Sequence, residues 1–524
     1  MRPRPLRPTC STLILVAVVA ASVLAAACSS DDSSKDSGSS TTAAALPTVA
    51  RLVDLRPLHV ENQRIVDDQG REVLLRGANV NALGEYYQGD PAVEPTAPVT
   101  DADWDAMAAH GLSVVRLIMS WSLLEPSKGQ IDQSYIDTVK EAVEAANERG
   151  LYVVLDMHQD AWGMSSATPA GTVCPDGTVP AIGWDGAPEW ATITDGATTC
   201  RLPDSERESA PAVQRAFANF YANTDGINDQ LTDVWAAVAT AFADQDGVAG
   251  YDLFNEPNAA EPTDANEVAY SQWVADTIAA IRAAEKEADA RSTSIFVEPL
   301  QLFPLPGNNL HPELIQDDNL VFAPHNYAES ISDILTVEQT FQVDQNGADA
   351  LKAALWIGEY GFWDTSAETL EVATRFAAQE DARALGGAWW QWRQTCGDPH
   401  SVAVPGGTRT ENEVHLITRT CPGDTDAGPT EEFLRILGRA YPRAAPGHIT
   451  VLRSDPTSGD LTVTGTGAEV GGELVVWLPE VPGTPDAQPF TTDGLDDVTL
   501  QAVQGGRILT ASTTAAEYTL AVNG

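Results

Sequence analysis

Short apolar runs alternate with longer stretches of mixed polar and apolar residues from about residue 60 to residue 442. Each apolar run has the length of a buried strand, and the stretches between them have the character of helices that cover a sheet. This alternation predicts a (β/α)8 barrel, preceded by a hairpin over 59–75 that closes the barrel bottom. The predicted strands are Val73–Asn79, Val114–Ser120, Tyr152–Met157, Val248–Phe254, Ile295–Val297, Leu320–Ala323, Leu355–Gly358 and Gly387–Gln391.

After Pro442 the pattern changes to short β-rich runs separated by Gly, Asp and Pro turns, and helical periodicity is absent. These runs predict a small antiparallel β-sandwich. The predicted fold is therefore an α/β chain with a TIM barrel over 47–443 and a C-terminal β-sandwich domain over 444–524. The predicted sandwich strands are Ile449–Leu452, Leu461–Thr464, Glu473–Leu478, Val498–Ala502, Arg507–Ala511 and Glu517–Val522.

Two helix starts are also readable between the first barrel strands. Thr100 with Asp103 predicts an N-cap followed by a first-turn acid. Ser134 with Asp137 predicts a second cap, for a helix that ends at Gly150.

Residues 1–28 have the features of a targeting segment that does not contribute to the fold. Arg2, Arg4 and Arg7 form a positive start, and the apolar run over 13–27 is too short to span a bilayer as a helix. The residues Leu-Ala-Ala-Ala before Cys28 resemble a bacterial lipobox, in which Cys28 is diacylated and becomes the mature N-terminus. The alternative is ordinary cleavage near residue 27, with an incidental cysteine.

Residues 29–46 are rich in Ser, Asp, Thr and Ala and predict a disordered tether, because they have too little apolar surface to fold. The expected location is the outer face of a bacterial cell membrane, as a lipoprotein, or the medium after secretion. The formal net charge of −45 disfavours nucleic acid as a partner. It also provides little attraction to an anionic membrane surface, so we interpret the acidity as a source of solubility.

Four cysteines remain after the targeting segment and Cys28 are set aside: Cys174, Cys200, Cys396 and Cys421. An even number of cysteines in an exported chain predicts disulfides. Three pairings are possible. The local one, Cys174 with Cys200 and Cys396 with Cys421, is favoured because each bridge closes one long loop. The spacing of His and Cys matches no zinc motif, and no metal or cofactor is expected.

Two glutamates directly follow predicted strands. Glu256, in Asn255-Glu256-Pro257, comes after 248–254, and Glu359 comes after 355–358. Carboxylates at the C-terminal ends of barrel strands face the mouth, where catalysis takes place. A retaining glycosidase needs two such groups, roughly 5–5.5 Å apart. We therefore predict Glu256 as the general acid/base and Glu359 as the nucleophile, with Asn255 hydrogen-bonding the sugar 2-hydroxyl. The alternatives are a helix cap beside a proline for Glu256 and a turn residue for Glu359.

Further polar residues stand at the ends of the third and sixth predicted strands. His158 and Asp160 follow the third strand and are candidates for binding sugar hydroxyls. His325 and Tyr327 follow the sixth, and a tyrosine hydroxyl beside the nucleophile can hold its carboxylate ionised. The alternative for His325 and Tyr327 is a buried pair that supports the wall.

Two more candidates come from the strands themselves. Arg116 lies inside the second strand, where it must be paired; beside the glutamates it would lower the pKa of the nucleophile. The alternative is a structural ion pair. Trp390 offers an aromatic platform for a sugar face, whereas Trp389 or Trp392 can belong to the core.

At these residues the chain resembles glycoside hydrolase family five. Segment 181–196, which contains Gly-Ala-Pro-Glu-Trp-Ala-Thr, is similar to a stretch of the endoglycoceramidases, as are segments 215–220 and 441–447. The resemblance covers about residues 60–524. One departure is the absence of a lysine from 79–87, the loop after the first strand, which leaves the preferred glycan open. The resemblance assigns site roles to His158, Asp160, Asn255, Glu256, Tyr327, Glu359 and Trp390.

The resemblance implies hydrolysis of the bond between a glycan and ceramide with retention of configuration. The expected partners are a glycolipid substrate and a membrane held through the N-terminal lipid anchor, and the expected state is a monomer. One alternative is a β-glucosidase or endoglucanase acting on steryl or simple glucosides or on β-glucans. A non-enzymatic alternative is a surface carbohydrate-binding lipoprotein. That alternative requires the loss of a catalytic carboxylate, and both are present.

Overall fold

The computed structural model describes residues 46–203, 205, 207–260, 263–301, 309–401, 414–481 and 489–523. The predicted targeting segment, the lipidation candidate Cys28 and nearly all of the predicted tether lie outside these residues. Within the described ranges, no helix has both the length and the apolar character that a bilayer crossing requires.

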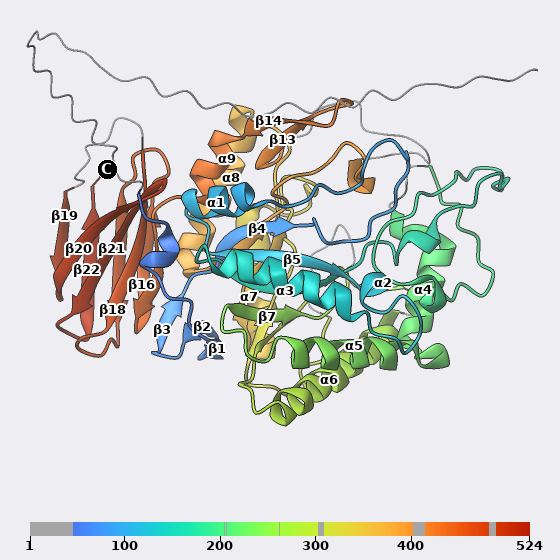
Figure 1. The fold of residues 1–524 in the computed structure, drawn as a ribbon, viewed down its shortest axis with the longest axis horizontal. Helices are drawn as coiled ribbons and strands as arrows, with labels where there is room; N and C mark the ends of the chain where they lie inside the picture. The colour runs from blue at the N-terminus through green and yellow to red at the C-terminus, as the bar shows by residue number, and fades with distance from the viewer. Residues whose placement is uncertain are drawn as a thin grey trace, which may run out of the picture. The chain divides into compact units, whose positions relative to one another are not determined.

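A nine-stranded parallel sheet forms the barrel and confirms the predicted TIM-barrel fold (Figure 1). Its strand order is β10-β9-β8-β7-β6-β5-β4-β12-β11, so the two end strands follow each other in the chain. They are the two halves of the predicted seventh strand, separated by the buried Trp356, whose backbone N–H donates to the carbonyl of Phe322 at 3.0 Å. The strands are β4 (Arg76–Val80), β5 (Val114–Ser120), β6 (Tyr152–His158), β7 (Val248–Asp252), β8 (Ser294–Val297), β9 (Leu320–Phe322), β10 (Ala354–Leu355), β11 (Ile357–Tyr360) and β12 (Gly387–Trp389).

Capping residues explain where the first helices begin. The backbone N–H of Thr100 donates to Asp103 at 2.8 Å, which is half of the predicted capping box of α1 (Asp101–Ala109). The predicted cap of α3 (Gln133–Asn147) at Ser134 is wrong. Asp132 caps this helix, because its carboxylate accepts the free backbone N–H of Ser134 at 2.8 Å. The other α-helices are α2 (Trp121–Leu124), α4 (Pro211–Tyr221), α5 (Ile227–Ala241), α6 (Thr263–Glu287), α7 (Val337–Leu351), α8 (Ala367–Arg383) and α9 (Glu431–Leu437).

Two antiparallel sheets form the C-terminal sandwich, and every predicted sandwich strand is present. The larger sheet has the order β1-β2-β3-β15-β18-β21-β20, and the smaller one β16-β17-β22-β19. The larger sheet contains strands from both ends of the described chain, seen in Figure 1 as blue strands beside red ones. Its strands are β1 (Leu58–Glu61), β2 (Arg64–Asp67), β3 (Arg71–Val73), β15 (Tyr441–Pro446), β18 (Glu473–Pro479), β20 (Leu495–Val503) and β21 (Gly506–Thr513). The smaller sheet contains β16 (His448–Ser454), β17 (Leu461–Thr466), β19 (Phe490–Asp493) and β22 (Glu517–Val522).

The N-terminal hairpin links the barrel to the sandwich. Strand β3 pairs with β15, with Val73 opposite Ala444, so the predicted domain boundary at 443/444 falls inside a strand of the shared sheet. Leu58 and Ile65 of the same hairpin lie in one buried cluster with barrel residues. The hairpin therefore contributes both to the barrel bottom and to the sandwich.

A buried charge cluster fixes α8 to the first barrel strand and to the sandwich. Asp381 accepts hydrogen bonds from Arg76 at 2.7 Å and from Arg439 at 2.8 Å. Its second oxygen accepts the backbone N–H of Ser454 at 3.1 Å. Burial alone would raise the pKa of Asp381, but the two arginines outweigh it and the pKa lies below its ordinary value.

Two disulfides close the long loops that follow the third and eighth barrel strands. Cys174 is bonded to Cys200 and Cys396 to Cys421, which confirms the local pairing. The second loop also carries a two-stranded ribbon, β13 (Ile417–Thr420) and β14 (Thr425–Pro429). Both loops reach the mouth of the barrel, where residues close to the bridges line the cavity.

Candidate active site

Glu256 and Glu359 meet at the C-terminal end of the barrel strands. Glu256 follows β7, and Glu359 lies within β11. One carboxylate oxygen of each glutamate and a ring nitrogen of His325 all lie within 4.8 Å of one another. Retaining glycosidases keep their two carboxyl groups about 5–5.5 Å apart, and inverting ones about 6.5–9.5 Å. The separation in this structure is that of a retaining pair.

The carboxylate of Glu359 is held by two donors. Arg116 donates to its Oε1 at 2.8 Å, and the hydroxyl of Tyr327 donates to its Oε2 at 2.8 Å. Burial is the largest influence on this group and raises the pKa of Glu359 above its ordinary value, against the opposing charges of His325 and Arg116. The two donors fix the orientation of the carboxylate and favour its ionised form.

The backbone at Glu256 is strained and held in place. Its φ is +38°, a left-handed conformation that a residue with a side chain rarely adopts. The backbone N–H of Glu256 donates to Glu298 at 2.9 Å, which anchors this turn. The strand therefore ends in a fixed bend at the residue predicted to be the acid/base.

His325 donates to the side chain of Glu256 from Nδ1 at 2.8 Å and lies 3.4 Å from Glu359. Burial opposes a charged imidazole, but Glu298, Glu359 and Glu256 outweigh it and raise the pKa of His325 well above its ordinary value. Burial likewise raises the pKa of Glu256, and the hydrogen bond and charge of His325 outweigh it, so this pKa lies below its ordinary value. His325 thus holds a proton next to the acid/base.

Arg116 lies beneath the cavity as the hub of the buried charges. Its guanidinium contacts Asp252 at 2.9 Å, Glu298 at 2.9 Å and Asp156 at 3.0 Å, in addition to Glu359. Both sequence-based explanations of Arg116 therefore apply, because it is a structural ion pair and also touches the predicted nucleophile.

Asn255 is positioned by the protein on both sides of its amide. Its Oδ1 accepts from Arg116 at 3.0 Å, and its Nδ2 donates to the carbonyl of Gln159 at 2.9 Å. The residue is buried beneath the cavity lining. A sugar hydroxyl therefore has to share these bonds in order to contact Asn255.

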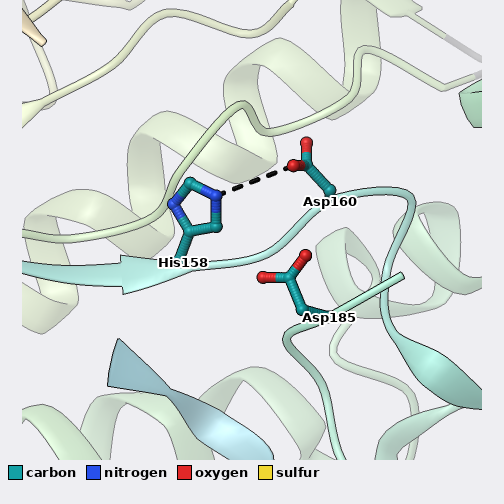
Figure 2. A group of neighbouring side chains, drawn as sticks. All are labelled: His158, Asp160 and Asp185. Atoms are coloured by element: carbon teal, nitrogen blue, oxygen red, sulfur yellow. Dashed lines mark ion pairs between the residues drawn. The ribbon is translucent and has the colours of Figure 1, made fainter. Parts of the chain in front are cut away.

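His158 and Trp390 form one wall. Their rings are stacked with centroids 5.4 Å apart and planes 10° apart, and Trp390 lines the cavity. The Nδ1 of His158 donates to Asp156 at 2.7 Å, and its Nε2 faces Asp160 at 3.6 Å (Figure 2). Trp389 and Trp392 are buried in the hydrophobic core, which decides between the two explanations for the tryptophan cluster.

Asp160 is bound by two residues that the sequence did not single out. Arg207 donates to its Oδ1 at 2.7 Å, and His400 donates to its Oδ2 at 2.8 Å. Burial opposes the charged ring of His400, but Asp398 and Asp160 outweigh it and raise the pKa of His400 to about 10. Both cations come from the long loops after the third and eighth barrel strands, which have no periodic pattern. His400 lies between Cys396 and Cys421, and Arg207 lies seven residues after Cys200. The cysteine spacing indicated closed loops but not which of their residues reach the cavity.

Among the residues that the structure describes, three groups of side chains have the composition of a metal site, and one of them is the buried group His158, Asp160 and Asp185 (Figure 2). Both oxygens of Asp160 are already occupied by Arg207 and His400. The carboxyl group of Asp185 is buried and has no hydrogen-bond partner among the described residues, and burial raises its pKa to about 8. A protonated carboxyl group is a poor metal ligand, so the raised pKa of Asp185 disfavours a cation at this group. The group Asp156, Asp252 and Glu298 surrounds the guanidinium of Arg116, and the third group is the Glu256, His325 and Glu359 set described above.

A cavity of about 590 Å³ lies over the two glutamates. Of the sequence-predicted site residues, Asp160, Glu256, Tyr327, Glu359 and Trp390 line it. Apolar side chains border it as well, including Ile331, which is 48% exposed, and Trp363. Arg116, His158, Asn255 and His325 lie behind this lining and support it.

Comparisons with known proteins agree with this geometry. The family model described as cellulase, glycosyl hydrolase family 5, matches residues 66–395. Endoglycoceramidase I of Rhodococcus hoagii (strain 103S) is 32% identical over 288 residues, which are 52% of this chain and 52% of that protein. An endoglycoceramidase of Cyanea nozakii is 28% identical over 235 residues, 40% of this chain and 42% of that protein. The matched part thus spans about half the length of these two curated relatives.

Two solved structures resemble the chain over most of its length. The crystal structure of an endogalactoceramidase superimposes with a TM-score of 0.82 and 39% identity, covering 89% of this chain and 100% of that one. Endo-glycoceramidase II from Rhodococcus sp., in complex with a cellobiose-like isofagomine, superimposes with a TM-score of 0.67 and 25% identity, covering 87% of this chain and 98% of that one. The similarity therefore includes both the barrel and the sandwich.

Proposed function

The chain belongs to glycosyl hydrolase family 5, and on that basis we propose that it is a retaining endo-β-glycosidase that cleaves the bond between glycan and ceramide in glycosphingolipids. The observation that carries this proposal is the pair of strand-end carboxylates whose oxygens lie within 4.8 Å. The endoglycoceramidase and endogalactoceramidase relatives supply the substrate class.

The geometry supports a two-step reaction. In the first step, an oxygen of Glu359 bonds to the anomeric carbon while the bond from that carbon to the ceramide oxygen breaks, and Glu256 gives this oxygen a proton. In the second step, Glu256 takes a proton from water, whose oxygen bonds to the anomeric carbon and releases Glu359. Arg116 and Tyr327 stabilise the carboxylate of Glu359 before it attacks and when it leaves.

His325 supplies the proton that the first step requires. In the protein without substrate, Glu256 is the ionised partner and His325 carries the proton, 2.8 Å away. Transfer of this one proton along the hydrogen bond converts Glu256 into the acid. The same transfer removes a positive charge 3.4 Å from Glu359, whose negative charge then interacts with Arg116.

A lipid leaving group fits the apolar side of the cavity. Ile331, Trp363 and Ala260 line it together with the two glutamates. Apolar surface beside a catalytic pair suits acyl chains better than a polysaccharide, which needs a row of polar sugar subsites. This border favours ceramide over the β-glucan and simple glucoside alternatives.

The test is product analysis with purified residues 46–524, which form one compact unit. The protein is incubated in detergent with gangliosides, lactosylceramide, galactosylceramide, a steryl glucoside and cello-oligosaccharides, and the products are identified by mass spectrometry. Intact oligosaccharide or sugar plus free ceramide is expected. Cleavage of only the cello-oligosaccharides or the steryl glucoside would refute the ceramide assignment and leave the catalytic pair in place.

We also propose that the protein is exported, anchored through a diacylated Cys28 and monomeric. The two disulfides support an oxidising compartment outside the cytoplasm. Mass spectrometry of the mature N-terminus and membrane fractionation of Cys28→Ser test the anchor. Release of the variant from the membrane is expected, and an unlipidated mature N-terminus would refute the anchor. Light scattering of the soluble unit tests the monomer.

A further inference from the structure

Asp160 lies at the centre of a polar cluster whose other members reach it from two separate loops. Arg207 donates to one oxygen at 2.7 Å and His400 to the other at 2.8 Å. Arg207 lies seven residues after Cys200, and His400 lies four residues after Cys396, so each follows a disulfide closely. The carboxylate is thus the meeting point of the two disulfide-closed loops.

Both cations are held rigidly by further contacts. The guanidinium of Arg207 stacks 4.0 Å from the ring centre of Trp184, and its Nε donates to Glu208. The ring of His400 donates from Nδ1 to Asp398 at 2.7 Å, and Asp398 is in turn bound by Asn81 at 3.2 Å. A cluster supported on all sides in this way is preorganised for a ligand.

The cluster faces the cavity next to the predicted acid/base Glu256. Arg207 and His400 both line the cavity, and their side chains are 24% and 15% exposed. Arg207 approaches the carboxylate of Glu256 to 3.7 Å, and the ring of His400 lies 5.1 Å from that of Trp390. This location is beside Trp390, the predicted platform for a sugar.

Neither residue gives or takes a proton in the catalytic steps, although Arg207 lies 3.7 Å from the carboxylate of Glu256. Glu359 is held by Arg116 and Tyr327, and the proton of the acid/base comes from His325. His400 also lies beyond residues 66–395, the part of the chain that matches the family model. The mechanism therefore does not explain why Arg207 and His400 are placed together in the cavity lining.

A sugar hydroxyl is both a donor and an acceptor, and this cluster offers both partners together. A hydroxyl that donates to Asp160 can accept from Arg207 or from His400 at the same point. An epimer whose hydroxyl points elsewhere loses both bonds while it still excludes water from the buried charges. Sites built in this way discriminate strongly against the wrong ligand, because their polar groups are then left unpaired.

We propose that Arg207 and His400, paired on Asp160, are specificity-determining residues that select the hydroxyl configuration of the sugar attached to ceramide. This inference rests on the proposed glycosidase function. Beyond that function, the loops that carry Arg207 and His400 recognise the sugar attached to ceramide. The protein thereby distinguishes a galactosyl from a glucosyl unit next to the ceramide.

The experiment compares two epimeric ligands in two ways, using the soluble unit with both disulfides intact. Binding is measured by calorimetry with piperidine iminosugars of gluco and galacto configuration, which differ only at the C4 hydroxyl. Hydrolysis is measured as kcat/KM on glucosylceramide and galactosylceramide with the same acyl chain. A wild-type preference of about tenfold or more for one epimer is expected in both measurements.

Arg207→Met and His400→Phe are expected to reduce this preference several-fold, mainly through loss of affinity for the favoured epimer. Arg207→Lys keeps a positive charge beside Asp160 but lacks the planar guanidinium group. This variant is therefore expected to retain part of the preference. The matched control is Arg375→Met, an arginine also held by two carboxylates, Glu329 and Glu338, that does not line the cavity. Thermal unfolding of each variant checks that it folds.

Equal binding of the two epimers by the wild type would overturn the inference. So would variants that weaken both ligands equally and leave the preference unchanged, since that is the result of a merely structural role. Selective iminosugar binding without cleavage of any glycolipid would refute the proposed function and retain only the selection of a sugar hydroxyl by the two residues.

Discussion

The hydroxyl of Tyr327 and the guanidinium of Arg116 bind opposite oxygens of one carboxylate, that of Glu359, each at 2.8 Å. One donor is neutral and the other is charged. Removing the neutral donor alone changes the pKa of the nucleophile without breaking the buried ion pairs.

Tyr327→Phe removes that hydrogen bond, which favours the ionised form of Glu359. The pKa of Glu359 is expected to rise, and because the nucleophile must be ionised, the acidic limb of the pH profile of kcat/KM should move to higher pH. The basic limb should stay in place. Tyr152→Phe is the control, since its buried hydroxyl donates to the carbonyl of Arg56 at the other end of the barrel. An unmoved acidic limb in Tyr327→Phe would contradict the assignment of Glu359.

His325→Asn removes the positive charge that both glutamates face. The pKa of Glu256 is held down by His325 against burial, so it should rise when the imidazole is lost. The pKa of Glu359 is also lowered by His325, so it should rise further. The acidic limb of the pH profile of kcat/KM, set by Glu359, is therefore expected to move to higher pH. The basic limb is expected to move to lower pH, because the proton used in the first step then resides on Glu256 alone and no longer on the pair of Glu256 and His325. A shift of one limb only would show that His325 acts on one carboxylate.

Glu359→Gln keeps the shape of the nucleophile and removes its charge. Hydrolysis should fall by about a thousandfold or more, because no covalent intermediate can form. Binding of the glycolipid should persist, since the cavity lining is otherwise intact. Calorimetry with glycolipid in detergent micelles measures the binding, and mass spectrometry measures the residual turnover. Full activity of this variant would mean that another residue is the nucleophile.

Asp381→Ala tests the cluster that joins α8 to the first barrel strand and to the sandwich. The change leaves the buried Arg76 and Arg439 without their shared carboxylate, which is expected to cost about 3–5 kcal/mol of unfolding free energy. Urea denaturation measures the loss. Asp276→Ala is the control, because that carboxylate is exposed on α6 and accepts a hydrogen bond from the side chain of Gln272 at 3.0 Å.

The same cluster predicts a pH dependence of stability. The folded pKa of Asp381 lies below its ordinary value, so its contribution is fully present above roughly pH 4, the unfolded pKa. That contribution is lost as the pH falls through the folded pKa. The difference in unfolding free energy between wild type and Asp381→Ala should therefore shrink in acid and stay constant near neutrality. A difference that does not change in acid would show that Asp381 is not the titrating group.

The barrel strands were predictable because each is short, wholly buried and largely apolar, and polar segments on both sides mark where such a run begins and ends. Two sandwich strands were missed for identifiable reasons. Strand β15 contains Pro442 and Pro446, which argue against a strand interior. Strand β19 is exposed along its whole length, so it has no apolar alternation to reveal it.

The functional residues also divide into those that the sequence predicted and those that it missed. Glu256 and Glu359 stand out because each ends an apolar run, where a charge is unexpected. Arg207 and His400 lie in loops whose course depends on the disulfides, so their approach to Asp160 cannot be read from local sequence. That Asn255 is bound by Arg116 on one side and by Gln159 on the other follows only from the three-dimensional structure.

The pairing of β3 with β15 has a consequence for how the chain is made. Residues 71–73 pair with residues 444–446. Strand β3 therefore cannot form these hydrogen bonds until the last part of the chain has been synthesised. A barrel truncated at residue 443 would expose the edge of β3 and the apolar face that the sandwich covers. The sandwich is therefore not a module that can be removed or exchanged, and the barrel of this enzyme reaches its full structure only after nearly the whole chain has left the ribosome.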